Sequence, residues 1–74
     1  MTNTKRIKDL VAKLEVVAAT LREISEEEQA AFDELSGSAR EGTKGERLQS
    51  KIDSLEGAEA SCREAIDALG ELVD

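Results

Sequence analysis

The segment LSGSAREGT, residues 35–43, separates two long amphipathic stretches and decides how this chain folds. Before it, mostly large aliphatic residues recur at alternating steps of three and four, with Glu28 in the one vacant position: Ile7, Leu10, Leu14, Val17, Leu21, Ile24, Ala31 and Leu35. After it the pattern returns, with Glu59 in the vacancy: Leu48, Ile52, Leu55, Cys62, Ile66, Leu69 and Val73. Such spacing keeps side chains on one side of an α-helix. The sequence therefore predicts two helices with facing apolar stripes.

The connection indicates where each helix begins and ends. We expect one all-α domain over residues 1–74, with a first helix over about residues 4–35, a connection over 36–43 and a second helix over 44–73. Gly37 can adopt the left-handed conformation that ends a helix. Residues 38–41 and 43–46 both read as capping boxes, so we place a single turn at 38–41 and start the second helix at Thr43. Matched helices with a short link form an antiparallel hairpin.

Folding the chain about residue 40 tests this arrangement. It brings Val17 near Cys62 and Ile24 near Leu55, so apolar residues meet along the seam. It also places the basic start of the first helix beside the acidic end of the second: Lys5, Arg6, Lys8 and Lys13 against Asp67, Glu71 and Asp74. Exposed ion pairs give only about 0–1 kcal/mol each, so these charges select the direction of packing more than they stabilise it.

The first helix carries apolar residues beyond its stripe, including Val11, Val16 and Phe32. An apolar face this wide is typical of a bundle helix rather than of a two-helix seam. We therefore expect the hairpin to assemble into a four-helix bundle or a higher homo-oligomer. The residues expected in that oligomer core are Leu14, Val17, Leu21, Ile24, Leu55, Cys62 and Ile66.

Composition limits the partners. The 10 Lys and Arg residues against 17 Asp and Glu residues give a net charge of -7, which repels nucleic acid and anionic membranes. No apolar run approaches the ~18 residues of a membrane span, and residues 1–20 lack the apolar block of a secretory signal. With a single cysteine and no sign of export, we expect a cytoplasmic protein with no direct nucleic-acid or membrane partner.

Glu28 and Glu59 occupy core-type positions, where inward carboxylates can bind metal ions in four-helix bundles. Those sites also use Glu-x-x-His, and the chain has no histidine. The favoured interpretation is that each glutamate lies at the rim and reaches water or a cation such as Lys51 or Arg63; a register-setting polar role is the alternative. Cys62 lacks an activating base, so we interpret it as a small packing residue. We expect no catalytic residue, metal or cofactor.

Two charged clusters are candidate binding surfaces. The first is an acidic patch on the first helix, which can dock a basic partner or simply be solvated: Glu23, Glu26, Glu27, Asp33 and Glu34. The second lies where the second helix starts, where backbone amides and the cations Arg40, Lys44 and Arg47 can hold an anion. No phosphate-binding fingerprint accompanies this second cluster.

From residue 26 onward the chain resembles a group of small acidic helical proteins encoded by phages and in bacterial genomes. The matching features are the run EEEQAAFDEL at 26–35, a Ser-rich connection, Gly45-Glu46, and the motifs at 52–56 and 65–69. The chain departs from the group in having no proline in the connection and in having Gly57 at a position that is usually charged. The resemblance implies a helical hairpin and a phage or prophage origin, hence a host cytoplasm, and it brings no activity.

Two functional hypotheses follow, neither of them enzymatic. The preferred one is a binding protein that acts through protein–protein interaction, such as a phage-encoded inhibitor of a host factor, with the acidic patch as its docking surface. The alternative is an oligomeric sponge that sequesters a small anionic or nucleotide ligand at a subunit interface.

Overall fold

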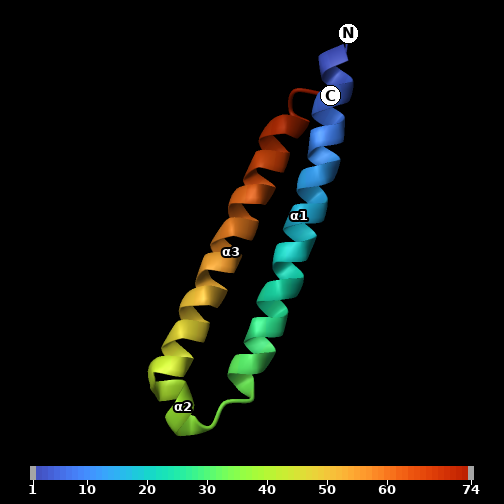
Figure 1. The fold of residues 1–74 in the computed structure, drawn as a ribbon. Coiled ribbons are helices and arrows are strands. Elements are labelled where there is room, and N and C mark those ends of the chain that lie inside the picture. The colour runs from blue at the N-terminus through green and yellow to red at the C-terminus, as the bar shows by residue number, and fades with distance from the viewer. Residues whose placement is uncertain (1, 74) are drawn as a thin grey trace.

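The computed structural model describes residues 2–73, apart from the side chain of residue 2. The described chain is mostly helical, with three helices: α1 (Thr2–Asp33), α2 (Gly37–Glu41) and α3 (Thr43–Gly70). Helices α1 and α3 run side by side in opposite directions, and the one-turn helix α2 lies in the connection at the far end (Figure 1). The expected all-α pair of long packed helices is thus confirmed.

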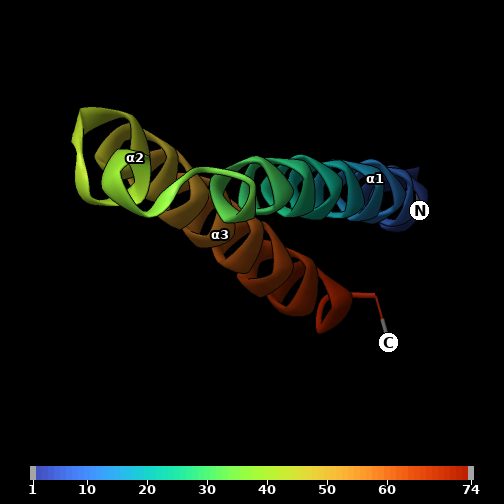
Figure 2. The ribbon, with the colours of Figure 1, turned by 90° about the horizontal axis from the view of Figure 1, so that it is seen from below.

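The molecule is a rod rather than a globule. Its extents are 58 × 14 × 14 Å, so the cross-section is little more than two helices wide. Viewed along the rod, α1 and α3 are inclined to each other, diverging from the α2 end (Figure 2). No third element covers the sides of the pair within residues 2–73.

On α3 the residues turned toward α1 are the ones that the spacing predicts. Ile52 is fully buried, and the rest of the stripe is half-buried: Leu48, Leu55, Glu59, Cys62, Ile66, Leu69 and Val73. The large apolar residues of this helix form a single stripe, so no other stripe of large residues competes to face α1.

On α1 the predicted stripe is wrong in every second position. The row Ile7, Leu14, Leu21 and Leu35 is half-buried as expected. The second row that packs against α3 lies one position later than predicted and comprises Val11, Ala18, Ser25 and Phe32. The residues predicted for it are exposed: Leu10, Val17, Ile24 and Ala31. Helix α1 is therefore rotated so that Ala18 and Ser25, rather than the larger Val17 and Ile24, meet α3 at mid-seam.

Small residues allow the two backbones to approach closely at mid-seam. Ala18 is 0% exposed and Ser25 is 7% exposed, although neither is a large apolar residue. Beside Ala18, the Cys62 thiol donates to the Leu14 backbone carbonyl at 3.2 Å. A side chain as short as cysteine reaches the opposite backbone only where the helices lie close together. Cys62 thus packs in the seam, as expected.

The connection forms the expected turn but with different caps. Ser36, not Ser38, caps α2, because its hydroxyl accepts a hydrogen bond from the Ala39 amide at 3.3 Å. Gly37 begins α2 instead of closing α1, and no described residue has a positive φ. The cap residue of α3 is Gly42, without a side-chain hydrogen bond, so the capping box expected at Thr43 does not form.

Gly45 permits the close packing of α2 against the start of α3. A Cβ placed on Gly45 would overlap the Arg40 carbonyl group and lie 2.6 Å from the Arg40 Cα atom. Gly57 also lies inside α3, but a Cβ placed there would have nothing within 4 Å. The two glycines therefore have opposite consequences for stability.

We predict that Gly45→Ala destabilises the fold by about 1–3 kcal/mol, because α2 must move away from α3 to admit the methyl group. Gly57→Ala, the matched control, should stabilise it by about 0.5–1 kcal/mol through improved helix propensity. Urea unfolding followed by circular dichroism measures both changes. Equal effects of the two substitutions would show that α2 does not pack against Gly45.

Candidate functional site

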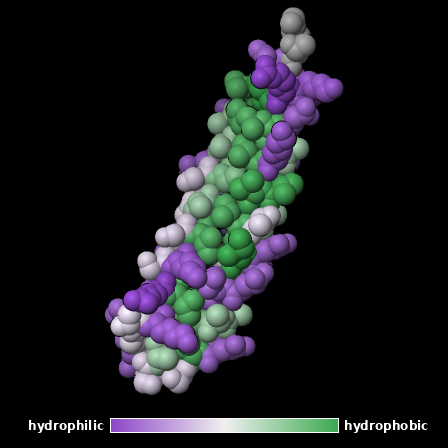
Figure 3. Space-filling view, in the orientation of Figure 1, coloured by the Kyte–Doolittle hydropathy of each residue, from purple (hydrophilic) through white to green (hydrophobic). Residues whose placement is uncertain are grey.

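One side of the hairpin carries an apolar stripe that no part of residues 2–73 covers. Its exposed members on α1 are Leu10 at 47%, Val17 at 48% and Ile24 at 39%. In Figure 3 hydrophobic surface forms a band along much of the rod, edged by hydrophilic side chains. On α3, Ala58 and Ala65 follow Lys51 at heptad steps on this same side. We call this surface the apolar side.

The two seam glutamates are paired as the rim interpretation predicts. Glu28 Oε1 lies 3.3 Å from Lys51 Nζ on the other long helix, and Glu59 Oε2 lies 2.9 Å from Arg63 Nε one turn later in the same helix. The glutamate side chains are 25% and 18% exposed, so both pairs are half-solvated. Lys51–Glu28 is the one ion pair that joins α1 to α3 among the described residues.

The acidic patch lies on the solvent face of α1 and on the turn that follows it. All five members are exposed: Glu23, Glu26, Glu27, Asp33 and Glu34. Arg22 Nε stands 3.7 Å from Glu26 Oε2, and the Gln29 amide donates to Asp33 Oδ1 at 3.1 Å. Both contacts are one turn apart within α1, so they leave most of the carboxylates open to solvent or to a partner. Glu28 does not belong to this face, because it turns toward Lys51.

Arg40 is engaged by the fold itself. Its Nη2 atom donates to the backbone carbonyl of Asp33 at 2.6 Å, which satisfies a carbonyl group at the open end of α1. Its guanidinium group also lies over the Phe32 ring, 5.9 Å from the centroid. Both contacts hold α2 against the end of α1. Of the three anion-binding candidates, Arg40 therefore has a structural role that its sequence position did not indicate.

The other two candidates line a shallow groove at the same end of the molecule. Lys44 and Arg47 lie there together with Lys51, opposite the end of α1. The α1 side and the groove floor comprise Ala31, Glu34, Leu35 and Leu48. Arg40 is not among the lining residues. Sequence reasoning missed the third cation, although the heptad step from Lys44 to Lys51 was a usable signal.

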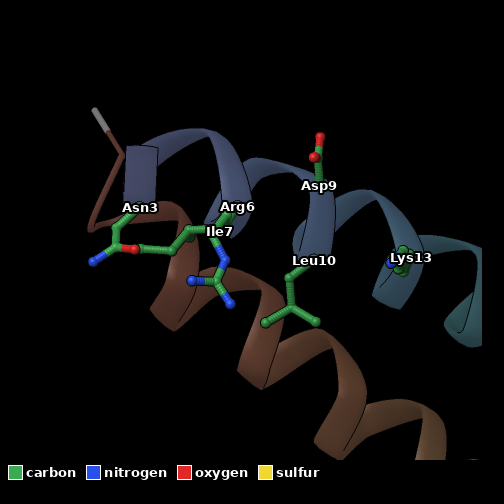
Figure 4. Close-up of a pocket in the computed structure, with 6 residues that line it drawn as sticks. All are labelled: Asn3, Arg6, Ile7, Asp9, Leu10 and Lys13. Atoms are coloured by element: carbon green, nitrogen blue, oxygen red, sulfur yellow. The ribbon is translucent and has the colours of Figure 1, made fainter. Parts of the chain in front are cut away.

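A second groove lies near the start of α1, lined by Asn3, Arg6, Ile7, Asp9, Leu10 and Lys13 (Figure 4). In this view Asp9 points away from α3, whereas Leu10 points toward the side on which α3 lies. The groove thus has an apolar floor with cations at its edge. It lies at the opposite end of the apolar side from the groove at Lys44.

Two features are absent from the described part of the chain, a metal-ligand cluster and a membrane-spanning helix. No group of three or more His, Cys, Asp or Glu residues there is arranged to hold a metal ion. Neither long helix of residues 2–73 contains the apolar length needed to cross a membrane. No protein-family model, curated protein or solved structure matches the chain.

We predict that Arg40→Ala lowers the free energy of unfolding by about 1 kcal/mol, because the Asp33 carbonyl loses its donor and Phe32 loses its cover. Arg47→Ala is the matched control and should change stability by less than about 0.5 kcal/mol, since Arg47 is exposed. Thermal unfolding of the two variants distinguishes these outcomes. A neutral Arg40→Ala variant would contradict the structural role.

Proposed function

We propose that this protein is a non-enzymatic binding protein that acts as a homo-oligomer of helical hairpins. The supporting observation is that the molecule exposes two kinds of surface, with Glu23, Glu26 and Asp33 of the acidic patch lying away from the apolar side. The apolar side suits association between copies, whereas the acidic patch on α1 has its members exposed and outside the seam. A protein built this way presents several acidic faces on one particle, which strengthens binding to a basic partner through multivalency.

The partner that fits the acidic patch is a protein with a basic surface. Fixed carboxylates on a rigid helix attract such a partner at long range and raise its association rate. The resemblance to phage-encoded acidic proteins supports a host protein as the target, with the hairpin acting as an inhibitor by occupying that basic surface in the host cytoplasm.

A second candidate function is an oligomeric sponge for a small anionic or nucleotide ligand. The observation that favours it is the groove where Lys44, Arg47 and Lys51 meet. Two observations count against this function. Glu34 places a negative charge in the same groove, and Lys51 already forms an ion pair with Glu28. Arg40 contributes no charge to this groove, so the candidate ranks second.

Reversing Glu23, Glu26 and Asp33 to lysine together should abolish capture of basic partners in an affinity pull-down from a bacterial lysate. The matched control reverses Asp53, Glu56 and Glu64 on α3, which are exposed and produce the same change of net charge. The control should keep its partners, because these three residues are exposed on α3 and do not belong to the patch on α1. Equal retention or equal loss in the two triple variants would contradict docking through α1.

The second candidate predicts a rise in melting temperature with a nucleotide, worth about 2.7 kcal/mol at one hundred times the dissociation constant. Arg47→Ala should remove that rise, whereas Arg40→Ala should keep it because Arg40 lies outside the groove. A panel of nucleotides without any shift, measured on the oligomeric protein, rejects the sponge and leaves the protein-binding function.

A further inference from the structure

The exposed apolar row of α1 is nearly self-complementary under a two-fold rotation. Its members are Leu10, Val17, Ile24 and Ala31, evenly spaced by seven residues. If a second α1 lies antiparallel against this row, with its centre between Val17 and Ile24, then Val17 meets the partner's Ile24 and Leu10 meets the partner's Ala31. Each large side chain thus meets an apolar residue, and the same contact occurs twice, as an isologous interface requires.

The row along the outer edge of this stripe carries charges that invert about the same centre. It comprises Arg6, Lys13, Thr20, Glu27 and Glu34, and all five are exposed. In the antiparallel arrangement the uncharged Thr20 lies at the two-fold axis. Lys13 then faces the partner's Glu27, and Arg6 faces the partner's Glu34. None of these four charged residues forms an ion pair within residues 2–73. Both charge pairs are therefore available to a second copy.

The positions of the two grooves are also consistent with the two-fold rotation. The groove near the start of α1 contains Arg6, Leu10 and Lys13, and the groove at the other end contains Ala31 and Glu34. The two-fold rotation places each groove over the other groove of the partner. Leu10 then meets Ala31 and Arg6 meets Glu34, while Lys44, Arg47 and Lys51 line the α3 side of the second groove.

The surface area of the hairpin is sufficient for such an interface. A compact monomer of 8.0 kDa exposes about 4,450 Å², whereas this chain exposes 5422 Å². The excess of about 1,000 Å² is comparable to the ~800 Å² that each partner contributes to a standard interface. On α3, the small residues Ala58 and Ala65 leave room on the same side for a second α3 to complete a four-helix bundle.

We infer that the apolar side of α1 docks a second copy of this chain, with the two α1 helices antiparallel and related by a two-fold axis at Thr20. This inference rests on the self-association in the proposed function and specifies its geometry. Glu27 and Glu34 of the acidic patch belong to this interface, so a basic protein partner is left with Glu23, Glu26 and Asp33, which lie outside the two rows.

The test is a charge swap measured by sedimentation equilibrium. Lys13→Glu and Glu27→Lys should each weaken the dimer about tenfold, because each creates two like-charge contacts in the symmetric interface. The double variant should regain the wild-type dissociation constant. The two residues are fourteen positions apart in one helix, about 21 Å, beyond the ~8 Å Debye length at physiological salt. A rescue therefore reports contact between chains.

The matched control pair is Lys8→Glu and Glu15→Lys. Both residues are exposed on the other side of α1, and their reversal changes net charge by the same amounts. Neither control should alter the dissociation constant by more than about twofold. Wild-type protein that stays monomeric, additive losses in the Lys13 and Glu27 double variant, or equal weakening by the controls would each overturn the interface. The pull-down with the acidic-patch variants tests docking of a basic partner separately, because those variants do not change the residues of this interface.

Discussion

Two helices lying side by side enclose no interior, and this constraint governs the rest of the structure. Each helix can bury only the face that meets the other, so among the described apolar residues only Ala18 and Ile52 are buried. The radius of gyration is 16.8 Å, against about 11 Å for a compact domain of this length. A chain with so small a core has little hydrophobic stabilisation of its own. We propose that the wide apolar face of α1 makes up for this small core by packing against a second copy of the chain.

The distribution of charge supports antiparallel contacts at each level. Helix α1 has no acidic residue in its first turn and no basic residue in its last, the reverse of what the helix dipole favours. In an isolated α1, charged residues at the two ends therefore give no stabilising interaction with the helix dipole. Placing the basic half of one helix beside the acidic half of another compensates for this arrangement. The proposed interface between two α1 helices follows this rule, whereas within the hairpin the one ion pair that joins α1 to α3 among the described residues is Lys51–Glu28.

The sequence predicted the helical hairpin because both stripes have an unambiguous period. It predicted the seam of α3 because that helix has one apolar row. It failed for α1 because two rows flank Leu14 and Leu21, and hydropathy favoured Val17 and Ile24 over Ala18 and Ser25. In the structure the two backbones lie so close together that the Cys62 thiol reaches the Leu14 carbonyl. Only small residues fit there, so Ala18 and Ser25 take the seam positions instead of Val17 and Ile24. Steric fit between helices is not visible in a hydropathy pattern.

Some contacts of the candidate sites could be predicted from the sequence, and others could not. Pairing of Glu28 with Lys51 and of Glu59 with Arg63 follows from helix spacing and register, so it was predictable. The separation of Arg40 from Lys44 and Arg47 depends on how the one-turn helix α2 folds back, and short caps are set by local hydrogen bonds. Ser36 and Gly42 take the capping roles that the pattern gave to neighbouring residues. The need for glycine at Gly45 likewise depends on the tertiary position of Arg40.

The central claim is that the apolar side is covered by a second copy and that the fold depends on this cover. Thermal unfolding by circular dichroism over a hundredfold range of protein concentration tests it most directly. If folding and dimerisation are coupled, mass action raises the melting temperature by about 10 °C across that range for two chains of this length. A melting temperature independent of concentration would mean that the hairpin is stable alone, and would contradict the account.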